Sequence, residues 1–285
     1  MLMGSEKHIR KVEAMFPDDV KTFIDESPEG TYTLLDVRQP EEYEEGHLPG
    51  AILISLPELG DSLRRLDAAR PTIVYCAVGG RSRAAAQFLA HRGFERVYSV
   101  TGGINAWTEP TAASPMDYHL RFVRGDETPE EIIQQCYGME EGLKRFHQAA
   151  MSKTADDELF ALMGSLVEAE ERHERALIGL MPGEGTGFRA ASGTAAPFME
   201  GGFDTENFLK ENERYLDSVT GYLELAMMIE THALDLYLRM ADVIANEQAR
   251  EVLLRIADEE KGHLAALGRL MGKEASEASG ASEYS

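Results

Sequence analysis

Cysteine is scarce in this chain of 285 residues, which contains only Cys76 and Cys136. Two cysteines without a framework of pairs exclude a small secreted scaffold held by disulfides, and they suit a reducing cytoplasm. They also exclude an iron site with four thiolate ligands. We therefore expect a cytoplasmic protein that has no electron-transfer centre of that kind.

Basic residues and long apolar runs are scarce as well. The chain has 28 Lys and Arg against 50 Asp and Glu, which gives a formal net charge of −22. Such a charge repels phosphates, so we expect neither nucleic acid nor an anionic membrane as a partner. No apolar run approaches 18 residues, and residues 1–12 are too polar for a signal peptide.

A Glu-x-x-His spacing occurs twice, at residues 170–173 and again, 90 residues later, at 260–263. Another glutamate precedes each copy by 30 residues, as Glu140 and Glu230. Apolar residues around them keep the same offset: Phe146 with Leu236, Ala176 with Ala266, Leu177 with Leu267, Leu180 with Leu270, and Met181 with Met271. This pattern predicts a duplicated helical hairpin.

The duplicated carboxylates and imidazoles predict a metal centre. A single Glu-x-x-His usually belongs to a solvated helix face, but two copies in register favour ligands that meet in a bundle core. Four buried carboxylates would repel one another and lose hydration without cations. Two divalent ions would balance them, and the donors suit iron or manganese, with zinc as a further alternative.

The stretch from Thr128 to Met271 resembles the ferritin-like di-metal carboxylate bundles and is nearest to rubrerythrins. The resemblance implies a four-helix bundle with two iron ions bound by Glu140, Glu170, His173, Glu230, Glu260 and His263. It also implies reduction of peroxide or oxygen, with iron binding or sensing without turnover as the alternative. Ala233 replaces a further glutamate of rubrerythrins, His147 replaces a tyrosine that Tyr237 keeps, and the four-cysteine rubredoxin module is missing.

The first part of the chain alternates strand-type runs with helical segments. Strands are expected at 33–37, 51–54, 72–75 and 97–100, with a short edge strand within 9–15. Helices are expected at 17–26, 56–66 and 82–92, and after Gly102-Gly103. This alternation predicts an α/β domain with a mainly parallel sheet that helices cover on both faces.

Cys76 follows a buried strand and begins the loop Cys76-Ala77-Val78-Gly79-Gly80-Arg81-Ser82. Backbone N–H groups of the loop and the N-terminus of the next helix favour a thiolate over a thiol. A buried core cysteine is the plain alternative. Two consecutive glycines followed by an arginine favour a functional site instead.

Residues 8–110 resemble the rhodanese family in this loop and in three further motifs: Asp36-Val37-Arg38, Gly46-His47-Leu48-Pro49-Gly50-Ala51 and Gly102-Gly103-Ile104-Asn105-Ala106-Trp107. The resemblance implies sulfur transfer through a persulfide on Cys76. Arg81 and the loop residues would stabilise it, namely Ala77, Val78, Gly79, Gly80 and Ser82. The six-residue loop from Cys76 to Arg81 favours sulfur transfer over the phosphatases and arsenate reductases of this fold.

Ala77 bears on the identity of the sulfur donor, whereas Arg38 and His47 bear on the local structure. Ala77 stands where thiosulfate enzymes usually place a basic residue, so a persulfide carrier with little thiosulfate activity is the alternative. We expect Arg38 to pair with Glu41 or Glu42, and His47 to be a structural turn residue.

The expected organisation is a rhodanese-like domain at 1–110, a linker at 111–127, a four-helix bundle at 128–273 and a disordered tail at 274–285. Bundle helices are expected at about 128–151, 155–181, 218–244 and 247–271, with a crossover at 182–203 and a short helix at 204–216. Cys136 is interpreted as a packing residue. The expected partners are a small sulfur donor, a thiol acceptor, an external electron donor such as rubredoxin, and a second copy of the chain in a homodimer.

Overall fold

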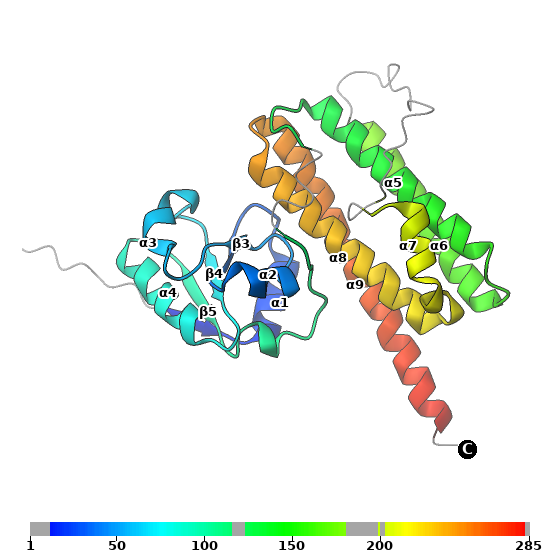
Figure 1. Cartoon of the computed structure of the whole chain (residues 1–285), viewed down its shortest axis with the longest axis horizontal. Coiled ribbons are helices and arrows are strands. Elements are labelled where there is room, and N and C mark those ends of the chain that lie inside the picture. The colour runs from blue at the N-terminus through cyan, green and yellow to red at the C-terminus, as the bar shows by residue number, and fades with distance from the viewer. Residues whose placement is uncertain (1–11, 116–122, 181–198, 200–202, 283–285) are drawn as a thin grey trace, which may run out of the picture. The chain divides into compact units, whose positions relative to one another are not determined.

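The computed structural model describes residues 12–115, 123–180, 199 and 203–282. The chain divides into two compact units, residues 1–116 and 117–285 (Figure 1). Most of the predicted crossover, the first residues of the predicted edge strand and the last three residues of the predicted tail lie outside the described residues. Within the described part, no helix is both long and apolar enough to span a membrane.

A parallel sheet of five strands forms the centre of residues 12–115. The strands are β1 (Glu13–Met15), β2 (Thr33–Asp36), β3 (Ile52–Leu53), β4 (Thr72–Tyr75) and β5 (Val97–Val100). Their order across the sheet is β1, β5, β4, β2, β3, and every pairing is parallel. The predicted α/β fold class is therefore confirmed.

Helices cover both faces of this sheet because neighbouring residues of each strand point to opposite sides. Leu34 and Ile73 pack on one side, whereas Leu35 and Val74 pack on the other. The first side is covered by α1 (Pro17–Glu26) and α2 (Pro40–Glu45), and the second by α3 (Leu59–Ser62) and α4 (Gly80–His91).

Three short helical segments differ from the prediction. The helix expected at 56–66 is only α3 followed by the 3₁₀ helix η1 (Leu63–Arg65), and Gly60 within it lowers helix propensity. The helix expected after Gly103 is a single 3₁₀ turn, η2 (Ile104–Ala106). Helix α2 was not predicted, although Pro40 at its first position is a start signal.

The second unit is helical, as predicted. Its main helices are α5 (Pro129–Met151), α6 (Asp157–Gly179), α8 (Val219–Val243) and α9 (Glu247–Ser282). Helices α5 and α6 pack against each other, and so do α8 and α9 (Figure 1). The short α7 (Thr205–Glu211) and the 3₁₀ helix η5 (Glu213–Asp217) precede α8. Thr128 and Glu131 form the predicted capping box at the start of α5.

The described residues at the ends of the predicted linker form backbone hydrogen bonds, and a helix continues into the predicted tail. Ala112 exchanges two backbone hydrogen bonds with His47, of 2.8 and 2.9 Å, and Gly125 accepts one of 2.9 Å from Ala245. Each described end of the segment 111–127 is therefore attached to its own unit. Helix α9 continues past Glu274 to Ser282, since the segment is rich in alanine and glutamate and contains no proline.

Candidate active site and metal centre

Cys76 lies directly after β4 and is 1% exposed. Its Sγ accepts hydrogen bonds from the N–H of Gly79 at 3.1 Å and the N–H of Ser82 at 3.4 Å. Gly79 adopts φ = 96°, a left-handed conformation that glycine reaches without strain, and it begins helix α4. The loop therefore points backbone donors at the sulfur, as the sequence predicted.

The Gly102-Gly103 turn supports this loop from behind. Ile104 N–H donates to the Cys76 carbonyl at 2.8 Å, and Asn105 N–H donates to the Ala77 carbonyl at 3.1 Å. A Cβ on Gly103 would lie 2.1 Å from the Cys76 carbonyl oxygen, so only glycine fits. The motif thus fixes the backbone on which the thiol is carried.

These contacts determine the acidity of the thiol. Burial alone would raise the pKa of Cys76, but hydrogen bonds from Ser82, Gly79 and Val78 lower it, and the net shift of the pKa is downward. Each of these donors stabilises a negative charge on sulfur. The arrangement favours a nucleophilic thiolate.

Arg81 is held beside the thiol by Glu42, a residue of α2. Arg81 Nη1 lies 2.7 Å from Glu42 Oε2, and Nη2 lies 2.6 Å from Oε1. The hydrogen bond from Arg81 lowers the pKa of Glu42 to about 2. Glu42 in turn raises the pKa of Arg81, as do the interactions of Arg81 with Cys76. Glu42 thus fixes a permanent cation at the loop.

The prediction that Arg38 pairs with Glu41 or Glu42 is wrong. Arg38 Nη2 lies 2.7 Å from Asp36 Oδ2 and 2.6 Å from the Gly46 carbonyl oxygen. Arg38 pairs with Asp36, the last residue of the buried strand β2, because Glu42 forms its ion pair with Arg81. His47 stacks on the ring of Tyr43 with centroids 3.7 Å apart, in agreement with a structural role.

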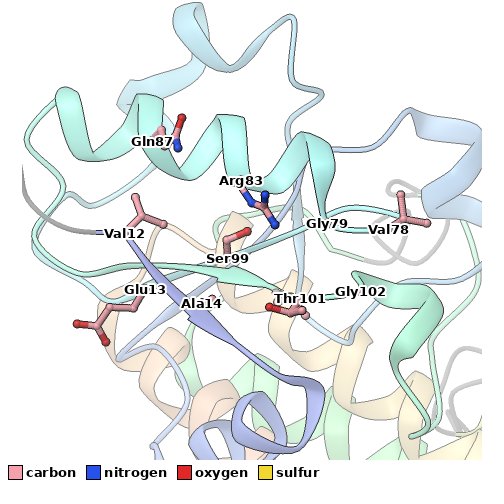
Figure 2. Close-up of a pocket in the computed structure, with 11 residues that line it drawn as sticks. Val12, Glu13, Ala14, Val78, Gly79, Arg83, Gln87, Ser99, Thr101 and Gly102 are labelled. Carbon is pink, nitrogen blue, oxygen red and sulfur yellow. The ribbon is translucent and has the colours of Figure 1, made fainter.

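A pocket of about 300 Å³ lies beside the loop and is lined in part by Val78, Gly79, Arg83 and Ser99. Figure 2 shows Arg83 extending from α4 toward Ser99 on β5. Ser99 Oγ lies 3.2 Å from Ser82 Oγ, which contacts the sulfur of Cys76. Arg83 was not predicted as a site residue, although its place in the first turn of the helix after the loop was a usable signal.

The structure brings the six predicted metal ligands together. His173 forms one group with Glu140 and Glu170, and a second with Glu260 and His263, and within each group the ligand atoms lie within 4.8 Å of one another. The rings of His173 and His263 stack with centroids 3.8 Å apart. Glu230 Oε2 completes the set, 3.6 Å from His263 Nδ1.

The burial of these carboxylates fits bound cations. Glu140, Glu170 and Glu260 are each 1% exposed, and Glu230 is 4% exposed. Oε2 of Glu170 and Oε2 of Glu230 have no hydrogen-bond partner. A buried carboxylate without a partner is strongly unfavourable unless a positive charge neutralises it. Four carboxylates with two imidazoles suit two divalent ions that prefer oxygen and nitrogen donors.

Electrostatic coupling already links the two halves of this group. Burial alone would raise the pKa of Glu230, but its interactions with the nearby His263 and Glu260 and the charge of His173 lower it, and the net shift of the pKa is downward. His173 belongs to the first copy of the repeat and His263 to the second. The two copies therefore form one site.

His147 and Tyr222 lie next to the ligands, and the sequence analysis did not predict that they meet. His147 Nδ1 forms a hydrogen bond with the Tyr222 hydroxyl, and Nε2 lies 3.8 Å from Glu170 Oε1. Burial lowers the pKa of His147, against the charges of Glu170 and Glu230. Burial also raises the pKa of Tyr222 well above its usual range.

Cys136 lies in the hydrophobic cluster between the helices, as the packing interpretation predicted.

Two family models match separate parts of the chain. The family model of the rhodanese-like domain matches residues 17–110, and that of rubrerythrin matches residues 221–284. The rhodanese-like match includes Cys76 and the Gly102-Gly103 turn. The rubrerythrin match includes Glu230 and the second Glu-x-x-His copy, whereas the first copy precedes it.

Several solved structures are similar to part of the chain. A rhodanese-like domain protein from Staphylococcus aureus shares 28% identity over 36% of this chain and 99% of that chain, with a TM-score of 0.34. A rhodanese-related protein from Thermoplasma volcanium shares 35% identity over 33% of this chain and 89% of that chain, with a TM-score of 0.30. The Alr3790 protein from Anabaena sp. shares 29% identity over 38% of this chain and 86% of that chain, with a TM-score of 0.34.

Proposed function

We propose that this chain, which joins a rhodanese-like domain to a rubrerythrin domain, is a sulfurtransferase that carries sulfur on Cys76 and is fused to a di-iron peroxide or oxygen reductase. The two families support sulfurtransferase-type and di-iron functions in general. The observation that carries the finer proposal is the Cys76 sulfur, which accepts two backbone N–H bonds beside an arginine held by a carboxylate.

Sulfur transfer proceeds in two displacements. The Cys76 thiolate attacks the outer sulfur of a donor, the sulfur–sulfur bond of the donor breaks, and the donor leaves with that electron pair. Cys76 then carries a persulfide whose terminal negative charge lies over the N–H groups of Gly79 and Ser82 and near Arg81. A second thiolate attacks the terminal sulfur, leaves as a new persulfide, and restores the Cys76 thiolate.

A persulfide is the better candidate for the donor than thiosulfate. Val78, at the loop, is 68% exposed and apolar, and Ala77 adds no cation beside the sulfur. Thiosulfate carries two negative charges, whereas much of the Arg81 charge is balanced by Glu42. A low-molecular-weight persulfide, which places an organic group against the loop, fits this lining better. A persulfide carrier with little thiosulfate activity is therefore the second candidate function.

Comparison of two donors tests this half of the proposal. The full chain should transfer sulfur from glutathione persulfide to a thiol acceptor at a higher kcat/KM than from thiosulfate. The Cys76→Ser variant is the control and should be inactive with both. Equal activity of wild type and Cys76→Ser would remove the basis for a persulfide mechanism.

The six predicted ligands of the second unit would hold two iron ions; Glu140, Glu170 and His173 belong to the first copy of the repeat, and Glu230, Glu260 and His263 belong to the second. Bound iron would supply the electrons that reduce peroxide or oxygen. The protein's part is to fix the donors in a buried site, where Glu170 and Glu230 each keep an oxygen without a hydrogen-bond partner.

Peroxide consumption separates a reductase from an iron-binding or sensing module. The iron-loaded, reduced protein should consume peroxide, and Glu170→Gln should consume it much more slowly. A separate protein such as rubredoxin, or a sulfur species, should supply the electrons, because the two cysteines of the chain cannot build a four-thiolate iron site. If neither rubredoxin with its reductase nor a sulfane donor re-reduces the oxidised protein, the storage or sensing function becomes the better account.

A further inference from the structure

The two halves of the metal centre are not identical, and the difference lies beside the ligands. His147 and Tyr237 occupy equivalent places in the 90-residue repeat, seven residues after Glu140 and Glu230. The residue that faces His147 also differs between the halves. Tyr222 bonds to His147, while its repeat counterpart is Ile132, which shares a hydrophobic cluster with Tyr237. One half therefore has a buried polar pair where the other has tyrosine and an aliphatic side chain.

The His147–Tyr222 pair is buried and aimed at one ligand. His147 is 1% exposed and Tyr222 is 0% exposed. Nδ1 of His147 is bonded to the Tyr222 hydroxyl, whereas Nε2 has no hydrogen-bond partner and faces Oε1 of Glu170 at 3.8 Å. Burying a ring nitrogen without a hydrogen-bond partner lowers the free energy of unfolding, so a stabilising partner is expected for Nε2.

The hydrogen-bonding capacity of the groups sets the direction of this chain of contacts. A carboxylate only accepts, so the imidazole nitrogen that faces Glu170 has to carry the proton. The other nitrogen of a neutral imidazole then accepts, and the Tyr222 O–H donates to it. Tyr222 thus selects the tautomer whose Nε2–H points at Glu170.

We propose that His147 is a positioning residue of the metal centre: fixed by Tyr222, it donates Nε2–H to Glu170 and orients that carboxylate toward the bound ion. The inference rests on the proposed di-metal site. The gap of 3.8 Å exceeds a hydrogen bond, and a shift of the Glu170 carboxylate by about 1 Å closes it. The partner that fixes a ligand typically contributes about 10–100-fold to metal affinity.

This assignment makes the two metal positions unequal. The ion on the Glu170 side has a ligand fixed by an imidazole and a buried phenol, whereas the place equivalent to His147 in the second copy of the repeat is occupied by Tyr237. Removing the His147 contact should therefore weaken one of the two binding steps and leave the other nearly unchanged.

The test is anaerobic titration of the full-length apoprotein with Co²⁺, followed by visible absorption and calorimetry. His147→Asn places an amide near the Nδ1 position and cannot reach Glu170, whereas His147→Gln places an amide N–H near the Nε2 position. We expect His147→Asn to weaken one step by about 10–100-fold and His147→Gln to stay within about fivefold of wild type. Equal losses in both variants would indicate a packing effect and overturn the proposal.

Phe146→Leu is the matched control. Phe146 is the buried neighbour of His147, and leucine occupies the equivalent repeat position, Leu236. It should lower thermal stability without changing either Co²⁺ affinity. A selective loss of one step in Phe146→Leu as large as in His147→Asn would also overturn the proposal.

Two further outcomes keep the test decisive. If His147→Asn does not fold, Tyr222→Phe carries the test, because it keeps His147 but removes the hydroxyl that selects the tautomer. An unchanged pair of affinities in Tyr222→Phe would then refute the role of His147. Wild-type protein that binds no Co²⁺ would instead refute the di-metal centre itself, so the two failures are distinguishable.

Discussion

Replacing Arg81 by alanine should slow persulfide formation on Cys76 strongly while leaving the fold intact. Arg81 is about a third exposed and makes no contribution to the buried core, but its guanidinium joins Glu42 to the loop. The variant loses the cation beside the sulfur. It also leaves the Glu42 carboxylate near the loop without its partner, where a second negative charge opposes that of the persulfide.

The size of the effect follows from these two contributions. One preorganised donor to a developing anion is typically worth about 10²–10³ in rate. Glu42 is 33% exposed, so solvent screens its charge, and its repulsion adds at most about fivefold. Glu42→Gln alone should change the rate by no more than about fivefold, since the cation stays. The double variant Arg81→Ala/Glu42→Gln should recover the added factor relative to Arg81→Ala.

The assay is single-turnover persulfide formation, with thiosulfate and glutathione persulfide as donors and intact mass as the readout. Circular dichroism and thermal unfolding of each variant control for folding. An unchanged rate of Arg81→Ala with both donors would show that the backbone N–H groups alone hold the anion. A loss in Glu42→Gln as large as in Arg81→Ala would show that Glu42 does more than hold the guanidinium, and would contradict the reasoning above.

Three further predictions follow from the two sites. Cys76→Ser should abolish sulfur transfer and leave the metal content, measured by mass spectrometry of the elements, unchanged; loss of metal would mean that the sites depend on each other. Because the pKa of Cys76 is lowered, the rate of persulfide formation should rise with pH through a midpoint below the usual value of about 8.5 and then level off, and Ser82→Ala should move that midpoint upward. Metal removal should lower the melting temperature of the second unit by about 5–10 °C in scanning calorimetry, compared with protein in Mn²⁺ at a hundred times the dissociation constant. Glu170→Gln should reduce this difference. An equal melting temperature with and without metal would contradict the argument that cations neutralise the buried carboxylates.

Local signals in the sequence predicted where the long helices begin, whereas α9 extends beyond its predicted end. The bounds of α1 and α5 match, because Pro17 and Pro129 open these helices and Thr128 with Glu131 caps α5. The short pieces around the first site were harder to predict. Ile104 and Asn105 use their N–H groups to hold the Cys76 loop, so the expected helix there is reduced to one turn. That is a tertiary requirement, which periodicity does not contain.

Some residues of the two candidate sites could likewise be predicted from local signals, and others could not. Glu-x-x-His and the upstream glutamates could be recognised because the repeat places them at equal offsets along helices. The partners of Arg38 and Arg81 could not be assigned correctly, since Arg81 meets Glu42 across 39 positions of sequence. His147 was visible as a break in the repeat, but its contact with Tyr222 comes from another helix, 75 positions away.

The two sites also depend on different interactions, and this explains why they should respond independently. The Cys76 loop is fixed by backbone hydrogen bonds inside one unit and needs no ion to complete it. The proposed metal ligands come from α5, α6, α8 and α9, so each hairpin supplies only half of them. Four buried carboxylates repel until cations bind, which couples metal binding to the folding of the second unit. In the proposed di-metal centre the same requirement explains the repeat in the sequence, because each hairpin would have to present its carboxylates and imidazole at the same spacing for the two halves to bind one pair of ions.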